Sequence, residues 1–501
     1  METAKRFFSA LISTLTLSVL TDQTAHAVSF VNNIVISSDQ TDLSGEPDGL
    51  NGNRLAGIFS DLYYDRSNNV YYGLSDAGPG GGTVSFNTKV QKFTLDVNPN
   101  TGEISNFNLL DTILFTDNGQ NLNGSDPSFL NGDSSVLGLS FDPEGFVVAP
   151  NGHFYVSDEY GPSVYEFLPD GSFLRALTTP DNLIPKNNTT PNYVDGRGTI
   201  TTGRQDGRGF EGLAISPDGT QLFAMLQAPL VNEGNANDGR LSANLRIVEF
   251  DTTTGTSTAQ YIYQLESLID INNRIPGTSN DFPATSQGRN IGISAITAIN
   301  EAEFLVIERD NRGFGVAAPT TTDIADNPVG TKRVYHIDIT GATDVSGLSL
   351  AGTSTLPGGV IPVTKSLFLD LQSELETAGQ LVTEKLEGLA IGPQLNDGSY
   401  ALLVGTDNDF SATQDSNDVQ FDVCTNALTT NPLAESQQVP INTPCPLDSQ
   451  NNPMSLIPTY LYSFKADVPN FVPLQTVPEP SVILGIISLG LGGLLLKKTN
   501  T

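Results

Sequence analysis

The sequence has no tryptophan and only three histidines and two cysteines among its 501 residues. Without tryptophan it lacks the commonest aromatic platform for sugars, and it contains neither a G-x-S-x-G nor an H-E-x-x-H motif. His153 and His336 each sit within an alternating strand pattern, so we expect them to be structural. A Ser-His-Asp triad is therefore hard to build, and metal-assisted or carboxylate-only chemistry is favoured.

Basic residues are also scarce, with 24 lysines and arginines against 56 acidic residues and a formal net charge of −32. Such a surface repels polyanions, which excludes nucleic acid as a partner, and it attracts divalent cations. Charged residues make up only 16% of the chain, while 48 glycines and 30 prolines are present. This composition is typical of a turn-rich, β-rich protein.

The first 27 residues follow the layout of a secretory signal peptide. Lys5 and Arg6 are followed by an apolar run over 7–20, and Ala25-His26-Ala27 gives the small-x-small pattern cut by signal peptidase. A buried N-terminal helix is the alternative interpretation. We expect signal peptidase to be a partner and the mature chain to begin at Val28.

The last 25 residues combine Pro478-Glu479-Pro480, an apolar run over 481–496 and two lysines. The apolar run is near the lower length limit for a membrane span, and the lysines favour a cytoplasmic end. This order resembles the PEP-CTERM sorting signals of bacteria, which implies processing by an exosortase-type enzyme; a plain membrane anchor is the alternative. Residues 477–501 thus predict a secreted or cell-envelope location, with the membrane contacted through the tail.

The only two cysteines, Cys424 and Cys445, lie 21 positions apart in a stretch rich in proline, asparagine and glutamine. In an oxidising compartment, two such cysteines most simply form a disulfide. Closing a loop of this length stabilises the fold by roughly 3 kcal/mol, because it constrains the unfolded chain.

Residues 28–476 carry an internal repeat made of a strand, a turn and a second strand. Three copies begin with Glu-Gly at residues 144, 211 and 387, and weaker copies begin at Ala56 and Ser294. Because each interval is longer than a compact propeller blade of about 40–45 residues, each must hold one blade with a long loop or, in places, nearly two blades. We predict an all-β fold, a single β-propeller of about five to seven blades closed by pairing of 28–37 with the last strand. A pair of β-sandwiches is the alternative.

Acidic residues recur at fixed places in this repeat. Glu144, Glu211 and Glu387 occupy one repeat position, which predicts that they lie at one level around the propeller axis. Like charges held so close repel one another unless a cation or a basic residue sits between them, and hard oxygen ligands favour Ca²⁺ or Mg²⁺. A second acidic set follows the next strands: Asp76, Asp158, Glu159, Glu308 and Asp407. The alternative is structural, with these carboxylates capping turn amides or pairing with arginine.

Arginines gather near the same carboxylates. Arg208 precedes Glu211 by three residues, and Arg309 directly follows Glu308. Because a guanidinium binds phosphate or carboxylate in a bidentate way, we predict that both arginines bind an anionic substrate. Neutralisation of the neighbouring carboxylates is an equally open interpretation.

The order of several short motifs resembles the phytase-like family described as having esterase-like activity of phytase. The matching stretches extend over roughly 50–465 and are Gly73-Leu74-Ser75-Asp76, Asp142-Pro143-Glu144-Gly145, Ser157-Asp158-Glu159-Tyr160-Gly161, Gly209-Phe210-Glu211-Gly212-Leu213, Leu386-Glu387-Gly388-Leu389 and Thr406-Asp407-Asn408-Asp409-Phe410. The resemblance implies a secreted, propeller-like phosphomonoesterase or esterase.

Two functions follow. The first is a Ca²⁺- or Mg²⁺-dependent hydrolase of a phosphate ester or other ester, with the following roles: Glu144, Glu211, Glu387 and Asp407 as metal ligands, Asp158 or Glu159 as general base, and Arg208 and Arg309 binding the small anionic substrate. The second is a non-catalytic extracellular module that binds a matrix component on its propeller face. A lactonase-like or sugar-oxidising propeller is a further alternative.

Overall fold

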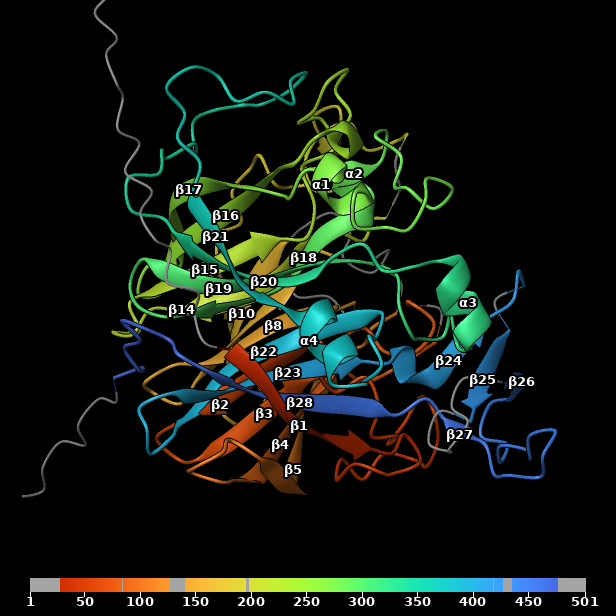
Figure 1. Ribbon diagram of the computed structural model, residues 1–501. Helices are drawn as coiled ribbons and strands as arrows, with labels where there is room; N and C mark the ends of the chain where they lie inside the picture. Colours follow the sequence, from red (N-terminus) through yellow and green to blue (C-terminus); the bar gives the residue numbers. More distant parts are fainter. Residues whose placement is uncertain are drawn as a thin grey trace, which may run out of the picture.

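The computed structural model describes residues 28–475 apart from 83, 126–139, 195–197, 418 and 427–434 (Figure 1). The predicted signal peptide and the predicted PEP-CTERM tail lie outside the described residues. Within the described part of the chain, no helix has the length and apolar character needed to cross a membrane.

Five four-stranded antiparallel sheets make up most of the fold. In order from the first strand of each outward, they contain β2 (Asp61–Asp65), β3 (Val70–Leu74), β4 (Lys89–Val97) and β5 (Ile104–Leu114); β8 (Pro143–Val148), β9 (Phe154–Asp158), β10 (Ser163–Phe167) and β11 (Phe173–Ala176); β14 (Phe210–Ile215), β15 (Gln221–Leu226), β16 (Asn244–Asp251) and β17 (Thr256–Gln264); β18 (Ile291–Ala298), β19 (Glu303–Asp310), β20 (Lys332–Asp338) and β21 (Thr364–Asp370); and β22 (Lys385–Gln394), β23 (Tyr400–Asp407), β28 (Thr459–Ala466) and β1 (Val28–Ile36).

The remaining elements are short and lie in the connections. They are the strands β6 (Thr116–Asp117), β7 (Gln120–Asn121), β12 (Lys186–Asn187), β13 (Thr190–Pro191), β24 (Ala412–Gln414), β25 (Gln420–Thr425), β26 (Ser436–Pro440) and β27 (Ser455–Leu456), and the helices α1 (Leu268–Asn272), α2 (Gln287–Asn290), α3 (Thr321–Asp326), α4 (Leu371–Thr377), η2 (Gly239–Leu241) and η3 (Asp409–Ser411).

The first strands of the five sheets contact one another in a cycle that runs from β2 to β8, β14, β18, β22 and back to β2. Apolar side chains from adjacent sheets form the hydrophobic clusters between them, so each sheet buries both of its faces. The fold is therefore all-β and propeller-like. The expected pairing of the first strand with the last is confirmed, because β1 pairs with β28 from Val28 opposite Ala466 to Ile36 opposite Thr459.

Four of the five predicted repeat copies coincide with the first strand of a sheet, namely β8, β14, β18 and β22. The copy predicted at 56–59 is wrong, because the first strand of that sheet is β2, where Asp61 pairs with Leu74. Ile58 and Phe59, which suggested the strand, are fully buried in the core just before it begins.

Close packing of the first strands explains why a glycine follows each repeat glutamate. Each glutamate lies at a shift in the pairing register between the first and second strands of its sheet. A Cβ atom on Gly145 would lie 2.6 Å from the backbone nitrogen of Leu213, and one on Gly212 would lie 2.9 Å from that of Ile296. Neighbouring first strands thus approach too closely for a side chain, and the local bulge turns the preceding glutamate into the space at their ends.

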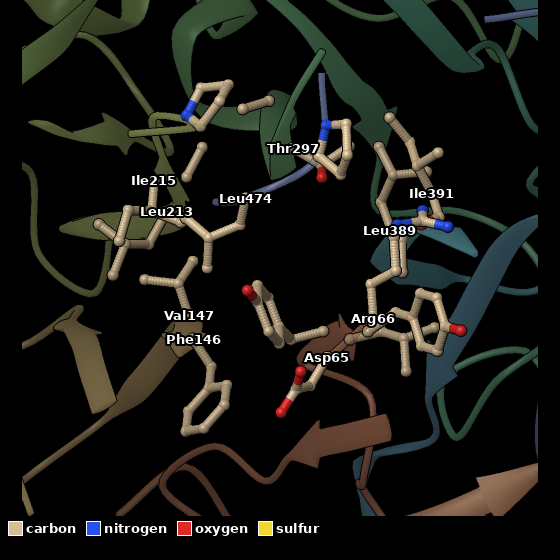
Figure 2. Close-up of a pocket in the computed structure, with 18 of the residues that line it drawn as sticks. Asp65, Arg66, Phe146, Val147, Leu213, Ile215, Thr297, Leu389, Ile391 and Leu474 are labelled. Carbon is tan, nitrogen blue, oxygen red and sulfur yellow. The ribbon is translucent and has the colours of Figure 1, made fainter. Parts of the chain in front are cut away.

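The opposite ends of the first strands are apolar and are covered by the segment that follows β28. Figure 2 shows Leu474 among Val147, Leu213 and Ile215, around a small cavity of about 90 Å³. Two backbone hydrogen bonds of 2.7 Å fix this segment, from Val472 to Ile299 and from Gln475 to Pro217. The end of the described chain is therefore part of the fold, on the side opposite the glutamates.

A separate small sheet, β24 to β27, lies at one edge of the molecule (Figure 1). Cys424 in β25 forms the expected disulfide with Cys445. β24 follows directly after β23 and η3, so this disulfide-linked sheet is joined to the fifth large sheet at the ends where its glutamate lies.

Candidate functional site

A cavity of about 460 Å³ opens where the first strands begin. Eight carboxyl side chains and three cationic side chains line it: Asp76, Asp142, Glu144, Glu159, Glu211, Glu384, Glu387 and Asp409, with Arg208, Arg309 and Lys385. The three glutamates of the repeat therefore meet in one cavity, as their shared repeat position predicts. The cavity also has an excess of acidic groups, which calls for additional positive charge.

Three of these carboxylates form a compact group. Oxygen atoms of Asp142, Glu144 and Glu159 all lie within 4.8 Å of one another. Burial, followed by the neighbouring Glu159, raises the pKa of Asp142; burial, followed by Glu211, raises the pKa of Glu144. These shifts indicate that Asp142 and Glu144 are costly to ionise without a counter-charge. Three carboxylates at this separation are a fitting donor set for a hard divalent cation.

The pairing of β8 with β9 creates this group. Glu144 lies in β8, Asp142 immediately precedes β8, and Glu159 immediately follows β9. The backbone N–H of Glu159 donates to the carbonyl of Asp142 at 2.9 Å, which holds the two ends together. The Asp142 carboxylate also accepts a 2.8 Å hydrogen bond from the backbone of Ala77, which links the group to the first sheet.

Asp158, which the sequence suggested as a general base, does not line the cavity. Its carboxylate is fully buried and accepts backbone hydrogen bonds from Asp142, Tyr160 and Gly161 at 3.0–3.1 Å. Burial raises its pKa to about 7 against these hydrogen bonds. Asp158 therefore holds the turn that presents Glu159, and Glu159 is the member of the pair that faces the cavity.

The other two repeat glutamates share an arginine. Arg309, from β19, forms an ion pair with Glu387 and lies 3.8 Å from Glu211. Burial, together with Glu159 and Glu387, raises the pKa of Glu211 to about 8, although Arg309 opposes this shift. Oε2 of Glu211 and Nε of Arg309 are buried and have no hydrogen-bond partner among the described residues. The alternative interpretation, pairing with arginine, thus holds for Glu387.

Arg208, a predicted substrate-binding residue, also lines the cavity. Its guanidinium donates to the side-chain oxygen of Gln227, and its Nε has no hydrogen-bond partner in the described part of the chain. Burial lowers the pKa of Arg208, while Glu159 and Glu211 oppose that shift. Arg208 and Arg309 therefore each present guanidinium atoms with unused hydrogen-bonding capacity.

Asp407, a predicted metal ligand, instead belongs to a cluster around Lys385. The ammonium of Lys385 lies 2.8 Å from Asp407 and 2.7 Å from Asp409. Asp409 lines the cavity, whereas Asp407 lies behind it and also accepts the backbone N–H of Asp409 at 2.9 Å. Neighbouring Glu384 has a buried, unpartnered Oε2 in the described structure, and burial raises its pKa to about 7.

Of the remaining acidic residues of the second set, one lines the cavity and the other does not. Asp76 lines the cavity and accepts the backbone N–H of Gly78 at 2.8 Å. Glu308 does not line it; its carboxylate accepts the hydroxyl of Tyr263, from the neighbouring sheet, at 2.7 Å and pairs with Lys365 of its own sheet. His153 lies 2.7 Å from Glu166 and His336 lies 3.3 Å from Glu303, both away from the cavity.

Sequence reasoning missed Asp142 and Glu384 as cavity residues. The signal for Asp142 was present, because it stands two residues before Glu144 in Asp142-Pro143-Glu144. Residues two apart on an extended chain point the same way, so a carboxylate two residues before a repeat glutamate was a candidate for the same cavity.

A sequence model of the family described as "Phytase-like: Esterase-like activity of phytase" matches residues 54–410. An "Uncharacterized secreted protein" of Arthroderma benhamiae is 28% identical over 453 residues, covering 76% of this chain and 86% of that protein. Among solved structures, similarity extends to the hydrazine synthase of Kuenenia stuttgartiensis (12% identity, 73% of this chain and 79% of that chain, TM-score 0.27).

A luciferin-regenerating enzyme is also similar, at 10% identity over 89% of this chain and all of that chain, with a TM-score of 0.29. A streptogramin B lyase is 8% identical over 87% of this chain and 98% of that chain, with a TM-score of 0.28. Scores this low carry no argument about fold or function. The family match includes all five first strands in full, together with all eleven charged residues of the cavity. The chain therefore belongs to the phytase-like family described as esterase-like activity of phytase.

Proposed function

We propose that this chain is an exported, divalent-cation-dependent hydrolase that acts on a phosphate ester or another ester of a small anionic substrate. The observation that carries the proposal is the group formed by Asp142, Glu144 and Glu159, with carboxylate oxygens within 4.8 Å of one another in a cavity that also contains Arg208 and Arg309.

Asp142, Glu144 and Glu159 are the residues that would hold the cation. Their donor atoms are all carboxylate oxygens, which suits Ca²⁺ or Mg²⁺ rather than a softer metal. Such a cation, when bound, neutralises negative charge on a substrate and lowers the pKa of a bound water. Three cationic side chains facing eight carboxyl groups leave an excess of negative charge that a divalent ion would reduce.

Arg208 and Arg309 would bind the substrate anion in the same cavity. Both are held by contacts that leave Nε without a partner in the described structure, and a guanidinium binds two oxygens of a phosphate or carboxylate at once. Glu211 interacts electrostatically with the proposed cation ligands and with the arginines, since Glu159 raises its pKa and Arg309 and Arg208 lower it. We assign it the exchange of a proton with the substrate.

The scaffold we propose is a five-bladed propeller, with one blade for each four-stranded sheet and with β1 completing the last blade. The secreted relative supports export of this chain, with signal peptidase and an exosortase-type enzyme as processing partners. The tail over 477–501 would then attach the protein to the cell envelope, at least transiently.

A second candidate function is binding without catalysis, with an extracellular matrix component held through a bridging cation. One observation favours it: Arg309 and Lys385 are already paired with Glu387 and with Asp407 and Asp409. A cavity whose cationic groups are so neutralised can bind a cation and a polyol or sugar acid without turning it over.

Ester hydrolysis by the purified exported protein separates these functions. Release of phosphate and of 4-nitrophenol is measured on a panel of esters with Ca²⁺, with Mg²⁺ and with EDTA. We expect EDTA-sensitive turnover that Glu144→Gln reduces at least about a hundredfold, because removing a ligand costs no less than removing a residue that supports one. Glu166→Gln is the matched control, since Glu166 is a buried carboxylate that pairs with Arg175 away from the cavity.

Each alternative outcome has a defined meaning. Turnover that survives both EDTA and Glu144→Gln would exclude the cation site. Calorimetric Ca²⁺ binding that Glu144→Gln abolishes, without turnover on any ester, would replace the hydrolase with the binding module.

A further inference from the structure

A strained turn forms one part of the cavity wall. Asp409, Phe410 and Ser411 have consecutive positive φ angles of 48°, 56° and 54°, and Asp409 lines the cavity. Positive φ is uncommon outside glycine, and for a bulky residue such as phenylalanine it is an outlier. Such a conformation persists only where the surroundings impose it, and it occurs most often at functional sites.

Side chains on both flanks of the turn hold it in place. Asn408 accepts the backbone N–H of Gly57 at 2.8 Å and donates to Ser38 and to the carbonyl of Ile457, both at 2.7 Å. On the other flank, the Ser411 hydroxyl donates to the carbonyl of Val423 and accepts the backbone N–H of Ile457, again at 2.7 Å. The turn is therefore fixed by contacts to chain segments far from it in sequence.

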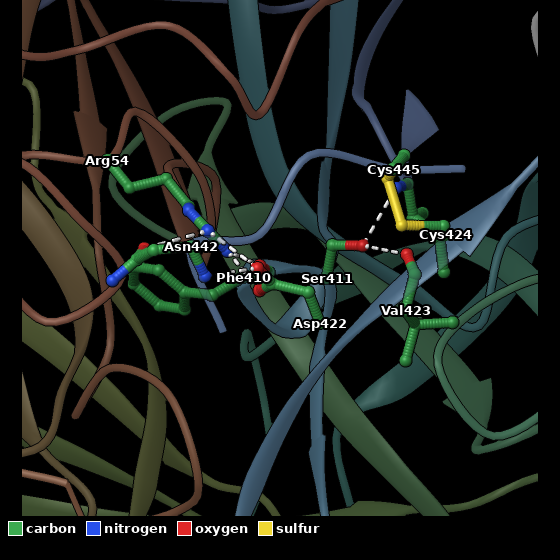
Figure 3. Close-up of a disulfide and its surroundings, with 9 residues drawn as sticks. Arg54, Phe410, Ser411, Asp422, Val423, Cys424, Asn442 and Cys445 are labelled. Carbon is green, nitrogen blue, oxygen red and sulfur yellow. Dashed lines mark hydrogen bonds and ion pairs between the residues drawn. A yellow bond between two sulfur atoms is a disulfide. The ribbon is translucent and has the colours of Figure 1, made fainter. Parts of the chain in front are cut away.

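Arg54 ties the middle of the turn to the disulfide-linked sheet (Figure 3). Its buried guanidinium forms a bidentate pair with Asp422, at 2.7 and 3.1 Å, and donates to the carbonyl of Phe410 at 3.3 Å. Asn442 completes the arrangement by donating its backbone N–H to Asp422 at 2.8 Å and accepting from Arg54 at 3.3 Å. A single arginine thus joins the turn, β25 and the loop closed by the disulfide.

The disulfide holds the partners of Arg54 and Ser411 together. Cys424 follows Asp422 and Val423 in β25, and Cys445 lies three residues after Asn442. β25 pairs with β24, where Asp422 stands opposite Ala412, and all three residues of β24 line the cavity. The disulfide-linked sheet is therefore a wall of the cavity as well as a support for the turn.

We propose that Arg54 and the Cys424–Cys445 disulfide are positioning elements of the site, which impose the left-handed turn that sets Asp409 against Lys385. This inference rests on the proposed function, because the wall that it positions, with Lys385, Asp409 and β24, belongs to the cavity in which that function places the substrate anion. Arg54 and the disulfide together form what we call the clamp. Without the clamp, the turn relaxes toward negative φ and Asp409 moves away from Lys385. The ammonium of Lys385 and β24 then lose their fixed positions in the cavity wall. Arg54 and the disulfide do not contact the substrate in this role; they act only through the turn that they position.

Three variants of the exported protein test this role: Arg54→Ala, Arg54→Lys and the double variant Cys424→Ser/Cys445→Ser. Arg246→Ala is the matched control, because Arg246 is another buried arginine with a two-contact pair, to Glu233 at 2.6 and 2.9 Å, away from the cavity. Amide hydrogen exchange over 408–414, the KM and kcat for a phosphate ester, and the affinity for inorganic phosphate are measured on each.

We expect Arg54→Ala and the cysteine variant to speed exchange over 408–414 and to raise KM between about tenfold and a hundredfold, the range that small misplacements produce, with a smaller change in kcat. Arg54→Lys should fall between these and the wild type, since lysine cannot form the bidentate pair. Arg246→Ala should lose stability without either change.

Contrary results are equally defined. Faster exchange with unchanged KM and phosphate affinity, or equal effects of Arg246→Ala, would reduce the clamp to a general stabiliser and overturn the inference. If the wild type turns over no ester, the proposed function fails by itself, and the affinity for inorganic phosphate then decides the positioning role. If Arg54→Ala does not fold, Arg54→Lys and the cysteine variant give the same readouts.

Discussion

Raising the pH should destabilise this protein when divalent cations are removed. The folded-state pKa of Glu211 is raised to about 8 and that of Glu384 to about 7, from an ordinary value of 4.5, mainly because both groups are buried. At a pH between 4.5 and these raised pKa values, the folded protein retains protons that the unfolded chain has released. The free energy of unfolding therefore falls as the pH rises from about 4.5 to about 8.

The expected loss follows from the size of these shifts. One pKa unit corresponds to about 1.4 kcal/mol, so Glu384 contributes about 3 kcal/mol and Glu211 about 5 kcal/mol as separate groups. The two share neighbours in one cavity, and their coupled titration makes the simple sum too large. We therefore expect about 3–5 kcal/mol from these two groups between pH 4.5 and 8, and a bound divalent cation should remove most of it, because it favours the ionised carboxylates.

Other buried carboxyls add a background that the cation does not affect. The pKa of Asp61 is raised to about 8 and that of Asp158 to about 7, also by burial, and neither lines the cavity. The quantity to test is therefore the difference between two pH series rather than either slope alone.

Urea unfolding followed by far-ultraviolet circular dichroism, at pH 5 to 8 with EDTA or with excess Ca²⁺, measures this difference. Glu211→Gln should flatten the EDTA series, whereas Glu166→Gln should not, because the pKa of Glu166 is lowered by His153 and Arg175, which outweigh its burial. Parallel series in EDTA and Ca²⁺, or a stability that rises with pH in EDTA, would refute the account of the cavity.

Further substitutions test individual contacts, each by urea unfolding. Arg309→Met should cost about 3–5 kcal/mol in EDTA, because it leaves Glu387 buried without its partner; an unchanged midpoint would show that the pair is not formed. Gly212→Ala should cost about 1–3 kcal/mol through overpacking between first strands, whereas Gly347→Ala, which meets no atom within 4 Å, should be neutral. Leu474→Ala should lower the free energy of unfolding by about 1–3 kcal/mol, because Leu474 packs over the apolar ends of the strands while remaining only partly buried. No loss would mean that this segment does not cover the strand ends.

The convergence of the repeat glutamates could be predicted from the sequence, because equal positions in a repeat become equal positions around a ring. Glu144, Glu211 and Glu387 meet in one cavity for that reason. The start of the first sheet could not be predicted in the same way. Ile58 and Phe59 are as apolar as a buried strand, and only the pairing of Asp61 with Leu74 shows where the strand begins.

Which of Asp158 and Glu159 joins Glu144 could not be predicted from local pattern, for a different reason. Asp158 and Glu159 are adjacent, and successive side chains of an extended chain point to opposite sides, so one of them faces the cavity and the other turns away. Which one does so depends on the register between β8 and β9, where Pro143 pairs with Asp158 and the bulge follows. That register brings Asp142 and Glu159 together, although 16 residues separate them.

The departure from repeat symmetry fits the proposal that the cavity binds both a cation and an anion. In the fourth sheet, Ser294 takes the bulged position that glutamate occupies in β8, β14 and β22, and its hydroxyl donates to the carbonyl of Leu386 at 2.7 Å. The same sheet contributes Arg309 from β19, which neutralises Glu387 and faces Glu211. A fourth glutamate would extend the ring of negative charge and favour an axial cation alone. Serine at this position and an arginine from the same sheet instead add cationic charge beside the carboxylates, which is what the proposed anionic substrate and cation would require.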